Sequence, residues 1–343
     1  MKKLTIGKVF AAAIGFCLVL SSCSKKDSFE PAATASHLAK GADVSWITEM
    51  EASGVQFFNA GGNAVDGLKL LRGLGMDAVR LRVWVDPERG WCNKNDVLVK
   101  ARRAHHLGMR IMVDFHYSDT WADPGQQTKP EAWKSLAFND LKKAVSEHTK
   151  EVLQLLKDND ITPEWVQVGN ETGNGMLWND GKASESMANY AVLNNAGYDA
   201  VKMIFPTAKV IIHLHNGFDN NLFRWMFDGL KENGGKWDVI GMSLYPTPEN
   251  WKERNTACVS NIKDMIARYN SEVMICEVGM SWDAADTAEI WLKDLFGSIN
   301  TVPDHKVLGI FYWEPLAYGG WNGYTLGAFD NNGRPTKALN AFK

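Results

Sequence analysis

The sequence predicts a single-domain (β/α)8 (TIM) barrel over residues 40–343. Three observations carry this prediction: eight short apolar runs alternate with longer helical patterns, no linker interrupts them, and no glycine-rich phosphate loop follows the first run. The runs are rich in Val and Ile and carry few charges, which is typical of strands buried on both faces. An open doubly wound sheet is the alternative, but the missing phosphate loop disfavours it.

Each expected element follows from this alternation. The strand-like runs are residues 41–46, 77–84, 110–117, 164–171, 209–216, 238–245, 273–280 and 307–314. The helical patterns between them are residues 68–74, 96–107, 138–158, 185–204, 221–232, 261–269 and 288–298. Gly75 and Gly108 each stand between a helical pattern and the next strand, where a glycine ends a helix.

The N-terminus predicts a targeting segment that is separate from the fold. Lysines precede a 12-residue apolar run, Val9 to Leu20, which is shorter than the roughly 20 residues of a membrane span. Ser21 and Ser22 precede Cys23, as in a bacterial lipobox, so we expect a signal peptide over 1–22 and a lipid on Cys23. The polar segment 23–39 then forms a flexible tether to the membrane. This predicts a lipid-anchored protein of a Gram-negative cell envelope, on the outer membrane; an ordinary signal peptide is the alternative.

The net charge and the cysteine content limit which ligands and partners the protein can have. The net charge of −3, which becomes more negative when the lysines of the signal are removed, argues against nucleic acid as a ligand. Beyond the signal, the cysteines are Cys92, Cys258 and Cys276, and their spacing matches no zinc pattern. Cys276 lies in an apolar predicted strand, so we expect it in the hydrophobic core. A disulfide between Cys92 and Cys258 is possible, but nothing in the sequence favours it. We expect a monomer.

Two carboxylates close apolar runs on the fourth and seventh predicted strands. Glu171 ends WVQVGNE and Glu277 ends VMICE, at the strand ends where barrels of this kind place their active sites. Hydrolysis of an acetal needs one protonated and one ionised carboxyl around a single bond. We therefore predict Glu171 as acid/base and Glu277 as nucleophile. The alternative is that each is a buried ion-pair partner, for example of Arg80 or Arg82.

Other strand-end residues supply supporting roles. Asn170 could bind a sugar hydroxyl, Tyr245 and Arg80 could hold the nucleophile ionised, and His116 and His215 could bind sugar or support the carboxylates. The competing interpretation is a metal-dependent hydrolase whose ligands are His213, His215 and Asp114.

The sequence holds 14 Trp, and many follow predicted strands. Flat indole faces stack on sugar rings, although about half of these residues would serve only as core. The candidates after strands are Trp84, Trp91, Trp121, Trp178, Trp282, Trp313 and Trp321. Of these, Trp121 and Trp313 are the best expected sugar platforms, with Trp84 as a further binding residue.

Several stretches together resemble glycoside hydrolase family 53, the endo-β-1,4-galactanase family. They are KGADVSW, VRLRVWVDP, DFHYSDTWADPGQQTKP, ITPEWVQVGNETGNGMLW, HLHNGFDNNLFRWMFD and DVIGMSLYP. The resemblance runs from about Lys40 to the C-terminus. It implies retaining endo-hydrolysis of β-1,4-galactan, the type I arabinogalactan side chains of pectin. It also implies that Glu171 is the acid/base, that Glu277 is the nucleophile, and that Arg80, His116, Asn170, Tyr245 and Trp313 are active-site residues.

Two departures from the family pattern bear on this expectation. Some relatives hold calcium in a longer loop after the seventh strand, but here VGMSWDAADTAEIW leads quickly into a helix, so we expect no cofactor. GNET also replaces a GNE-apolar continuation, and we expect little effect. Two other hypotheses stay open: a retaining enzyme for another β-1,4-glycan, mannan or glucan, and a non-catalytic lipoprotein that binds surface glycans.

Overall fold

The computed structural model describes residues 1, 3 and 38–343. The predicted signal peptide, the lipidation site Cys23 and nearly all of the predicted tether lie outside the described residues. Across the described part, no helix combines the length and the apolar character needed to cross a bilayer.

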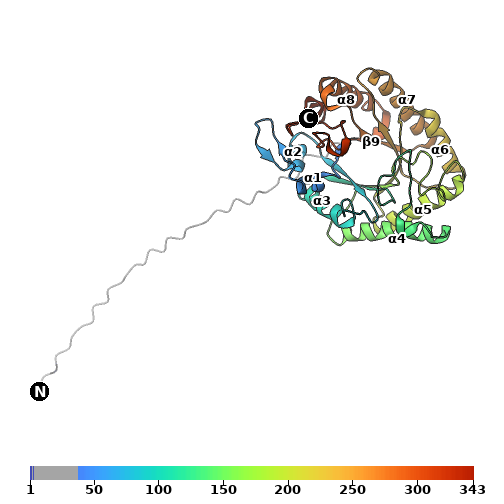
Figure 1. Ribbon diagram of the computed structural model, residues 1–343, viewed down its shortest axis with the longest axis horizontal. Coiled ribbons are helices and arrows are strands. Elements are labelled where there is room, and N and C mark those ends of the chain that lie inside the picture. The colour runs from blue at the N-terminus through green and yellow to red at the C-terminus, as the bar shows by residue number, and fades with distance from the viewer. Residues whose placement is uncertain (2, 4–37) are drawn as a thin grey trace. The chain divides into compact units, whose positions relative to one another are not determined.

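Eight parallel strands close into one barrel, in the order β1-β10-β9-β8-β7-β6-β5-β4 (Figure 1). The barrel strands are β1 (Ala39–Asp43), β4 (Ala78–Val83), β5 (Arg110–Phe115), β6 (Trp165–Val168), β7 (Lys209–Leu214), β8 (Val239–Leu244), β9 (Glu272–Val278) and β10 (Val307–Tyr312). Each predicted run overlaps one of these strands, so the barrel prediction is confirmed. The strands end one to three residues before the predicted runs do, because the polar residues at those ends belong to the loops.

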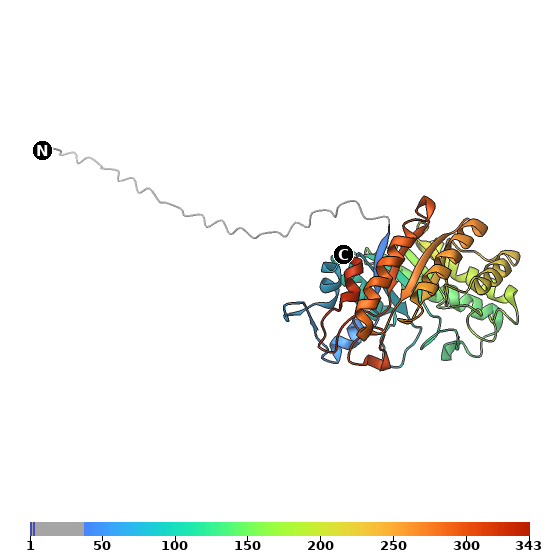
Figure 2. The ribbon, with the colours of Figure 1, turned by 90° about the horizontal axis from the view of Figure 1, so that it is seen from above.

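Helices surround the barrel (Figures 1 and 2). They are α1 (Ile47–Ala52), α2 (Gly67–Gly73), α3 (Lys94–His106), α4 (Phe138–Lys157), α5 (Met187–Ile204), α6 (Asn220–Glu232), α7 (Trp251–Tyr269) and α8 (Ala285–Ile299). All seven predicted helices form. Helix α1 and the hairpin of β2 (Phe57–Phe58) and β3 (Ala64–Val65) were not predicted, since each is too short for a hydrophobic period. Helix α7 begins ten residues before the predicted start at Asn261, since its first turns are polar.

Local chemistry sets the helix ends. Side chains accept hydrogen bonds from the first-turn N–H groups of α2, α3 and α5, through Asp66, Asn93 and Ser186. Gly75 has a φ of 101°, and a Cβ there would lie 2.2 Å from the carbonyl oxygen of Phe342. The predicted glycine stop after α2 is therefore required both by conformation and by space.

The interior of the barrel divides into an apolar floor and a charged upper layer. Ala78, Met112, Trp165 and Ile211 belong to a fully buried cluster inside the barrel. Two residues further along the same four strands stand the buried polar residues Arg80, Asp114, Gln167 and His213. Because side chains two apart on a strand share a face, the same inward face changes from apolar to polar toward the strand ends. The buried polar side chains therefore lie toward the carboxyl ends of the strands, where the loops begin.

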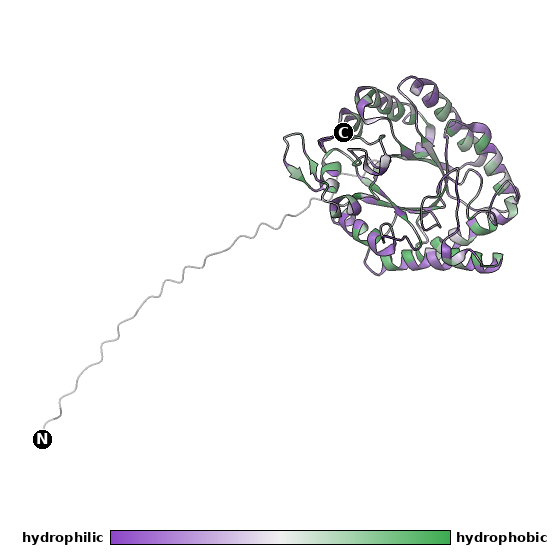
Figure 3. Ribbon diagram, in the orientation of Figure 1, coloured by the Kyte–Doolittle hydropathy of each residue, from purple (hydrophilic) through white to green (hydrophobic). Residues whose placement is uncertain are grey.

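A second apolar cluster lies between the strands and the helices. In Figure 3 the helices carry hydrophobic and hydrophilic residues on different sides, as amphipathic helices around a barrel should. Cys92, Cys258 and Cys276 are all buried and free, so the possible Cys92–Cys258 disulfide does not form. Cys276 belongs to the cluster inside the barrel, as predicted.

Candidate active site

A cavity of about 1020 Å³ opens at the carboxyl ends of the barrel strands. This volume is at the upper end of the ~300–1,000 Å³ typical of ligand pockets, so it has room for more than a single small group. Glu171 and Glu277 both line it, as do the predicted site residues His116, Asn170, Tyr245, Trp84, Trp121 and Trp313. The structure thus brings both carboxylates to one cavity. Arg80 lies directly beneath it, fully buried.

Glu171 is the third residue after β6 and has a positive φ of 44°. The hydroxyl of Ser243 donates to Glu171 Oε1 at 2.6 Å and itself lies 2.8 Å from Nε2 of His213. Burial lowers the pKa of His213 far below its usual value, so this ring is neutral. Burial also raises the pKa of Glu171 to about 7. Glu171 can therefore carry a proton near neutral pH.

Glu277 lies in β9 and is held by two donors. Arg80 Nη1 is 2.9 Å from Glu277 Oε1, and the hydroxyl of Tyr245 donates to Oε2 at 2.7 Å. Burial raises the pKa of Glu277, and repulsion from Glu171 adds to this, while Arg80 and Tyr245 oppose it. Two facing carboxyls of this kind share one proton. The full positive charge of Arg80, 2.9 Å from Glu277, favours the ionised form of Glu277 and leaves the proton on Glu171.

Arg80 connects four strands of the barrel. Its guanidinium forms ion pairs with Asp43, Asp114 and Glu277 at 2.7, 2.9 and 2.9 Å, and it donates to the amide oxygen of Asn170 at 2.8 Å. Burial alone would lower the pKa of Arg80, but the carboxylates raise it well above its usual value. The charge is therefore permanent. Arg80 fixes Glu277 and Asn170 relative to each other.

His116 and Asn170 are mostly occupied by protein partners. His116 Nε2 lies 3.1 Å from Asp114, while Nδ1 accepts from the backbone N–H of Ala122 and the indole N–H of Trp84. Both ring nitrogens are therefore used, and His116 supports Asp114 rather than offering a free donor. Asn170 donates one amide hydrogen to the carbonyl of Ala122, which leaves its second hydrogen for a ligand.

His215 is not among the residues that line the cavity, contrary to the prediction that placed it there. It stands just after β7, and its ring lies against Gly173, where a Cβ would be 2.3 Å from His215 Cε1. The strand has ended before His215, so the period of two that places His213 inward no longer applies.

The alternative metal site does not assemble. His213 directs Nε2 to Ser243 and Nδ1 to the side chains of Gln167 and Asn170, and Asp114 faces Arg80 and His116. No three His, Cys, Asp or Glu side chains of the described residues are grouped so that they could hold a metal ion.

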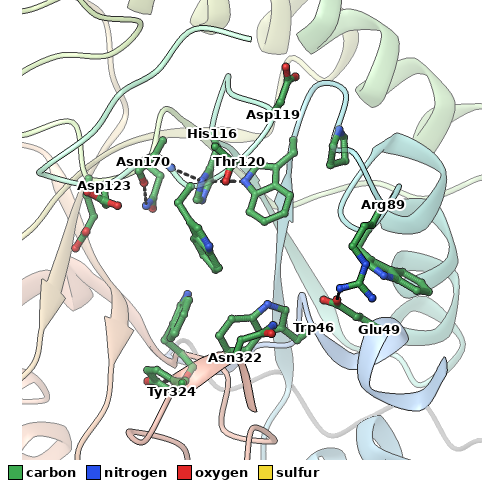
Figure 4. A pocket seen from close by; sticks show the side chains of 18 of the residues that line it. Trp46, Glu49, Arg89, His116, Asp119, Thr120, Asp123, Asn170, Asn322 and Tyr324 are labelled. Carbon is green, nitrogen blue, oxygen red and sulfur yellow. Dashed lines mark hydrogen bonds and ion pairs between the residues drawn. The ribbon is translucent and has the colours of Figure 1, made fainter. Parts of the chain in front are cut away.

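Tryptophans form one wall of the cavity, part of which Figure 4 shows. Trp46 lies edge-on to Trp121 and Trp313, with ring centroids 5.7 and 5.1 Å apart, and Trp84 meets Trp121 at 5.3 Å. The guanidinium of Arg82 lies 4.2 Å from the ring centroid of Trp121, within reach of a cation–π interaction. Trp91 also lines the cavity. The other tryptophans considered, Trp178, Trp282 and Trp321, do not.

Sequence reasoning missed several residues of this site. Ser243 was not considered, although it lies in β8 two residues before Tyr245 and, like Tyr245, donates a hydrogen bond to one of the two carboxylates. Glu49 comes from the unpredicted helix α1, and Arg89 comes from the segment after β4. Tyr324 follows the last strand at some distance along the chain. No sequence pattern marks the last three residues as part of the cavity.

Comparison with known proteins agrees with this architecture. Residues 39–290 match the sequence profile described as glycosyl hydrolase family 53. The chain is 31% identical to a probable arabinogalactan endo-beta-1,4-galactanase A of Neosartorya fischeri, over 82% of this chain and 85% of that protein. It is 30% identical to an arabinogalactan endo-beta-1,4-galactanase of Thermothelomyces thermophilus, over 80% and 89%.

Two solved structures resemble this chain at a similar level of sequence identity. A structure of fungal beta-1,4-galactanases superposes with a TM-score of 0.81 at 29% identity, over 89% of this chain and 98% of that one. The GH53 catalytic domain of Ignisphaera aggregans gives a TM-score of 0.81 at 28% identity, over 92% and 98%. The profile match covers most of the chain, and the fold and the paired carboxylates agree with it. The chain is a glycoside hydrolase and belongs to glycosyl hydrolase family 53.

Proposed function

We propose that this enzyme hydrolyses internal β-1,4-galactosidic bonds of galactan with retention, with Glu171 as acid/base and Glu277 as nucleophile. One observation carries the proposal: the two carboxyls face one cavity from the fourth and seventh barrel strands, and only Glu277 is paired with a buried arginine. The names of the relatives supply the substrate class, since the galactanases above act on arabinogalactan.

The reaction has two displacements. In the first, ionised Glu277 attacks the anomeric carbon while protonated Glu171 gives its proton to the departing glycosidic oxygen. The product is a galactosyl ester on Glu277 and a shortened chain with a free hydroxyl. In the second, Glu171 takes a proton from water, the water oxygen attacks the same carbon, and Glu277 leaves as a carboxylate. Two inversions give overall retention.

The supporting groups act on specific atoms in this scheme. Tyr245 and Arg80 each contact one oxygen of Glu277, so they fix which lone pair meets the sugar. Burial raises the pKa of Tyr245 far above its usual value, so its hydroxyl stays a donor. The remaining amide hydrogen of Asn170 is available for a sugar hydroxyl next to the reacting carbon. Trp121 and Trp313 would stack on sugar rings, and Trp84 would hold a further ring or support Trp121.

Azide rescue of alanine variants tests the assignment. We expect Glu171→Ala and Glu277→Ala to lose nearly all cleavage of purified galactan, while Glu147→Ala, on the outer helix α4, keeps it. Azide should then restore turnover of an aryl galactoside carrying a good leaving group. The product should be the β-azide with Glu171→Ala and the α-azide with Glu277→Ala. Unchanged product formation by Glu277→Ala would favour the glycan-binding hypothesis, and preferential cleavage of mannan or β-glucan would change the substrate.

We further propose a lipid-anchored monomer that needs no metal. The sequence over 1–39 supports a signal peptide ending at Ser22, a lipid on Cys23 and a tether, which together would place the barrel 40–343 on the outer membrane. A radiolabelled fatty acid should enter the wild-type protein and not Cys23→Ala. Light scattering should give the mass of one chain, and chelator should leave galactan cleavage unchanged.

A further inference from the structure

One end of the cavity carries side chains that the two displacements do not use. This region is formed by helix α1 and the segment after β4, and we refer to it as the distal end. Its lining residues are Glu49, Asp86, Glu88, Arg89 and Trp91. In Figure 4, Glu49 and Arg89 lie together at one side of the pocket, well apart from Asn170 and Asp123.

Glu49 and Arg89 form an asymmetric ion pair across this end. Arg89 Nη1 lies 2.9 Å from Glu49 Oε1, and the side chain of Glu49 is 10% exposed while that of Arg89 is 69% exposed. The buried carboxylate thus holds one nitrogen of a guanidinium whose other donors are open to the cavity and to solvent. Within residues 38–343, Glu49 is the sole polar partner of Arg89. An arginine carries five N–H donors in a planar fork, so several remain for a ligand.

Trp91 differs from the other tryptophans of the cavity. Trp46, Trp84, Trp121 and Trp313 contact one another through their rings. In the described part of the chain, Trp91 has neither a ring contact nor a hydrogen-bond partner, and it is partly exposed. Its indole is therefore free of the aromatic packing that occupies the others. A flat apolar face beside a donor fork is the combination that binds a sugar ring.

The segment that carries Arg89 and Trp91 is fixed before any ligand arrives. The backbone N–H of Trp84 donates to the carbonyl of Cys92 at 2.8 Å, and the N–H of Asp86 donates to the side chain of Asp119 at 2.9 Å. Gly90, with a φ of 75°, closes a turn onto the carbonyl of Pro87 at 2.9 Å. A site that is already ordered binds without the entropic cost of ordering a loop.

We propose that the distal end is a sugar-binding subsite, in which Trp91 stacks on a neutral hexose unit of the chain and Arg89 donates to its adjacent hydroxyls. This inference rests on the proposed galactanase function. It adds two residues that determine how strongly longer galactan chains are bound. The unit is neutral because Glu49, Asp86 and Glu88 outnumber the single positive charge of Arg89, which disfavours a uronate. Arg89 and Trp91 act away from the carboxylates, so they affect chain binding and not bond cleavage.

Length-resolved kinetics test the proposal. We expect Arg89→Ala and Trp91→Ala to lower kcat/KM about tenfold on the longest galacto-oligosaccharides, mainly through KM, and to leave the shortest cleaved oligosaccharide unaffected. Arg224→Ala is the matched control, because Arg224 also pairs with a less exposed carboxylate, Asp264, but on the outer helices α6 and α7. It should match wild type at every length. Melting temperatures should stay within a few degrees, since both changed side chains are partly exposed.

An equal loss at every chain length, or no loss at any, would overturn the subsite. Calorimetric titration of the wild-type protein with the same oligosaccharides gives a second measurement that does not depend on turnover. Oligosaccharides that are long enough to reach the distal end should bind more tightly than shorter ones. This gain in affinity should vanish in Arg89→Ala. Wild-type protein that binds these chains with this length dependence but does not cut them would contradict the proposed catalysis and support the subsite. A flat length dependence in the wild-type protein would contradict the subsite.

Discussion

Replacing Ser243 by alanine should shift the basic limb of the pH profile upward. The hydroxyl of Ser243 donates to Glu171 Oε1 at 2.6 Å and so stabilises the ionised carboxylate. A hydrogen bond to a charged group contributes about 1.5–3 kcal/mol, and one pKa unit corresponds to about 1.36 kcal/mol. The pKa of Glu171, which burial raises to about 7, should therefore rise by about one to two units in Ser243→Ala.

The assay follows from the proposed role of Glu171 as the acid. As pH rises through its pKa, Glu171 loses the proton that the first displacement needs, so kcat/KM falls. Measured on galactan from pH 4 to pH 10, this fall should move to higher pH in the variant even if the maximum rate is lower. Ser271→Ala is a matched control: Ser271 accepts a hydrogen bond from Trp237 at 2.8 Å, away from the cavity. A basic limb that stays in place or moves down would refute the reasoning.

Three further predictions concern the nucleophile, a buried pair and acid stability. Tyr245→Phe removes a donor to Glu277 and should lower kcat on galactan about 10- to 100-fold with little change in KM; a loss confined to KM would contradict this. Arg82→Met removes the charged neighbour of the buried carboxyl of Glu314 and should lower the free energy of unfolding by about 1–3 kcal/mol, and adding Glu314→Gln should recover part of this loss in urea titrations. Burial lowers the pKa of His148 from 6.5 to about 4, so its unfolded form binds the proton more tightly and stability falls as pH drops from 6.5 towards 4. Between pH 7 and pH 5, His148→Phe should therefore lose about 2 kcal/mol less stability than wild type, and equal losses would count against this origin.

The sequence predicted the barrel because its signal is repeated eight times. Each strand is buried on both faces and must be apolar at its start, so the runs stand out against the helical patterns. Glu171 and Glu277 could be predicted for a related reason. A carboxylate that ends such a run has to face the interior or the rim, and the fourth and seventh strands of a closed barrel bring the two to one opening.

Other parts of the site depend on pairings that no local pattern encodes. The short helix α1 brings Glu49 next to Arg89, which lies forty residues further along the chain, and only the closed barrel places them together. His215 does not line the cavity, and because it follows the end of β7, the period of two that places His213 inward gives no position for it. The hydroxyl of Ser243, in β8, reaches Glu171, which follows β6, across the end of the one intervening strand β7, and the sequence neighbours of neither residue reveal this contact.

The position of Arg80 has a consequence for how the enzyme becomes active during folding. Its three carboxylate partners come from β1, β5 and β9, so the last of them lies far beyond the arginine along the chain. Until β9 and β10 join, the nucleophile has no place to dock and the first strand has no neighbour on its other side. A chain stopped before its final strand should therefore be inert even if it is largely helical. The first appearance of galactan cleavage during folding would therefore mark the closure of the barrel.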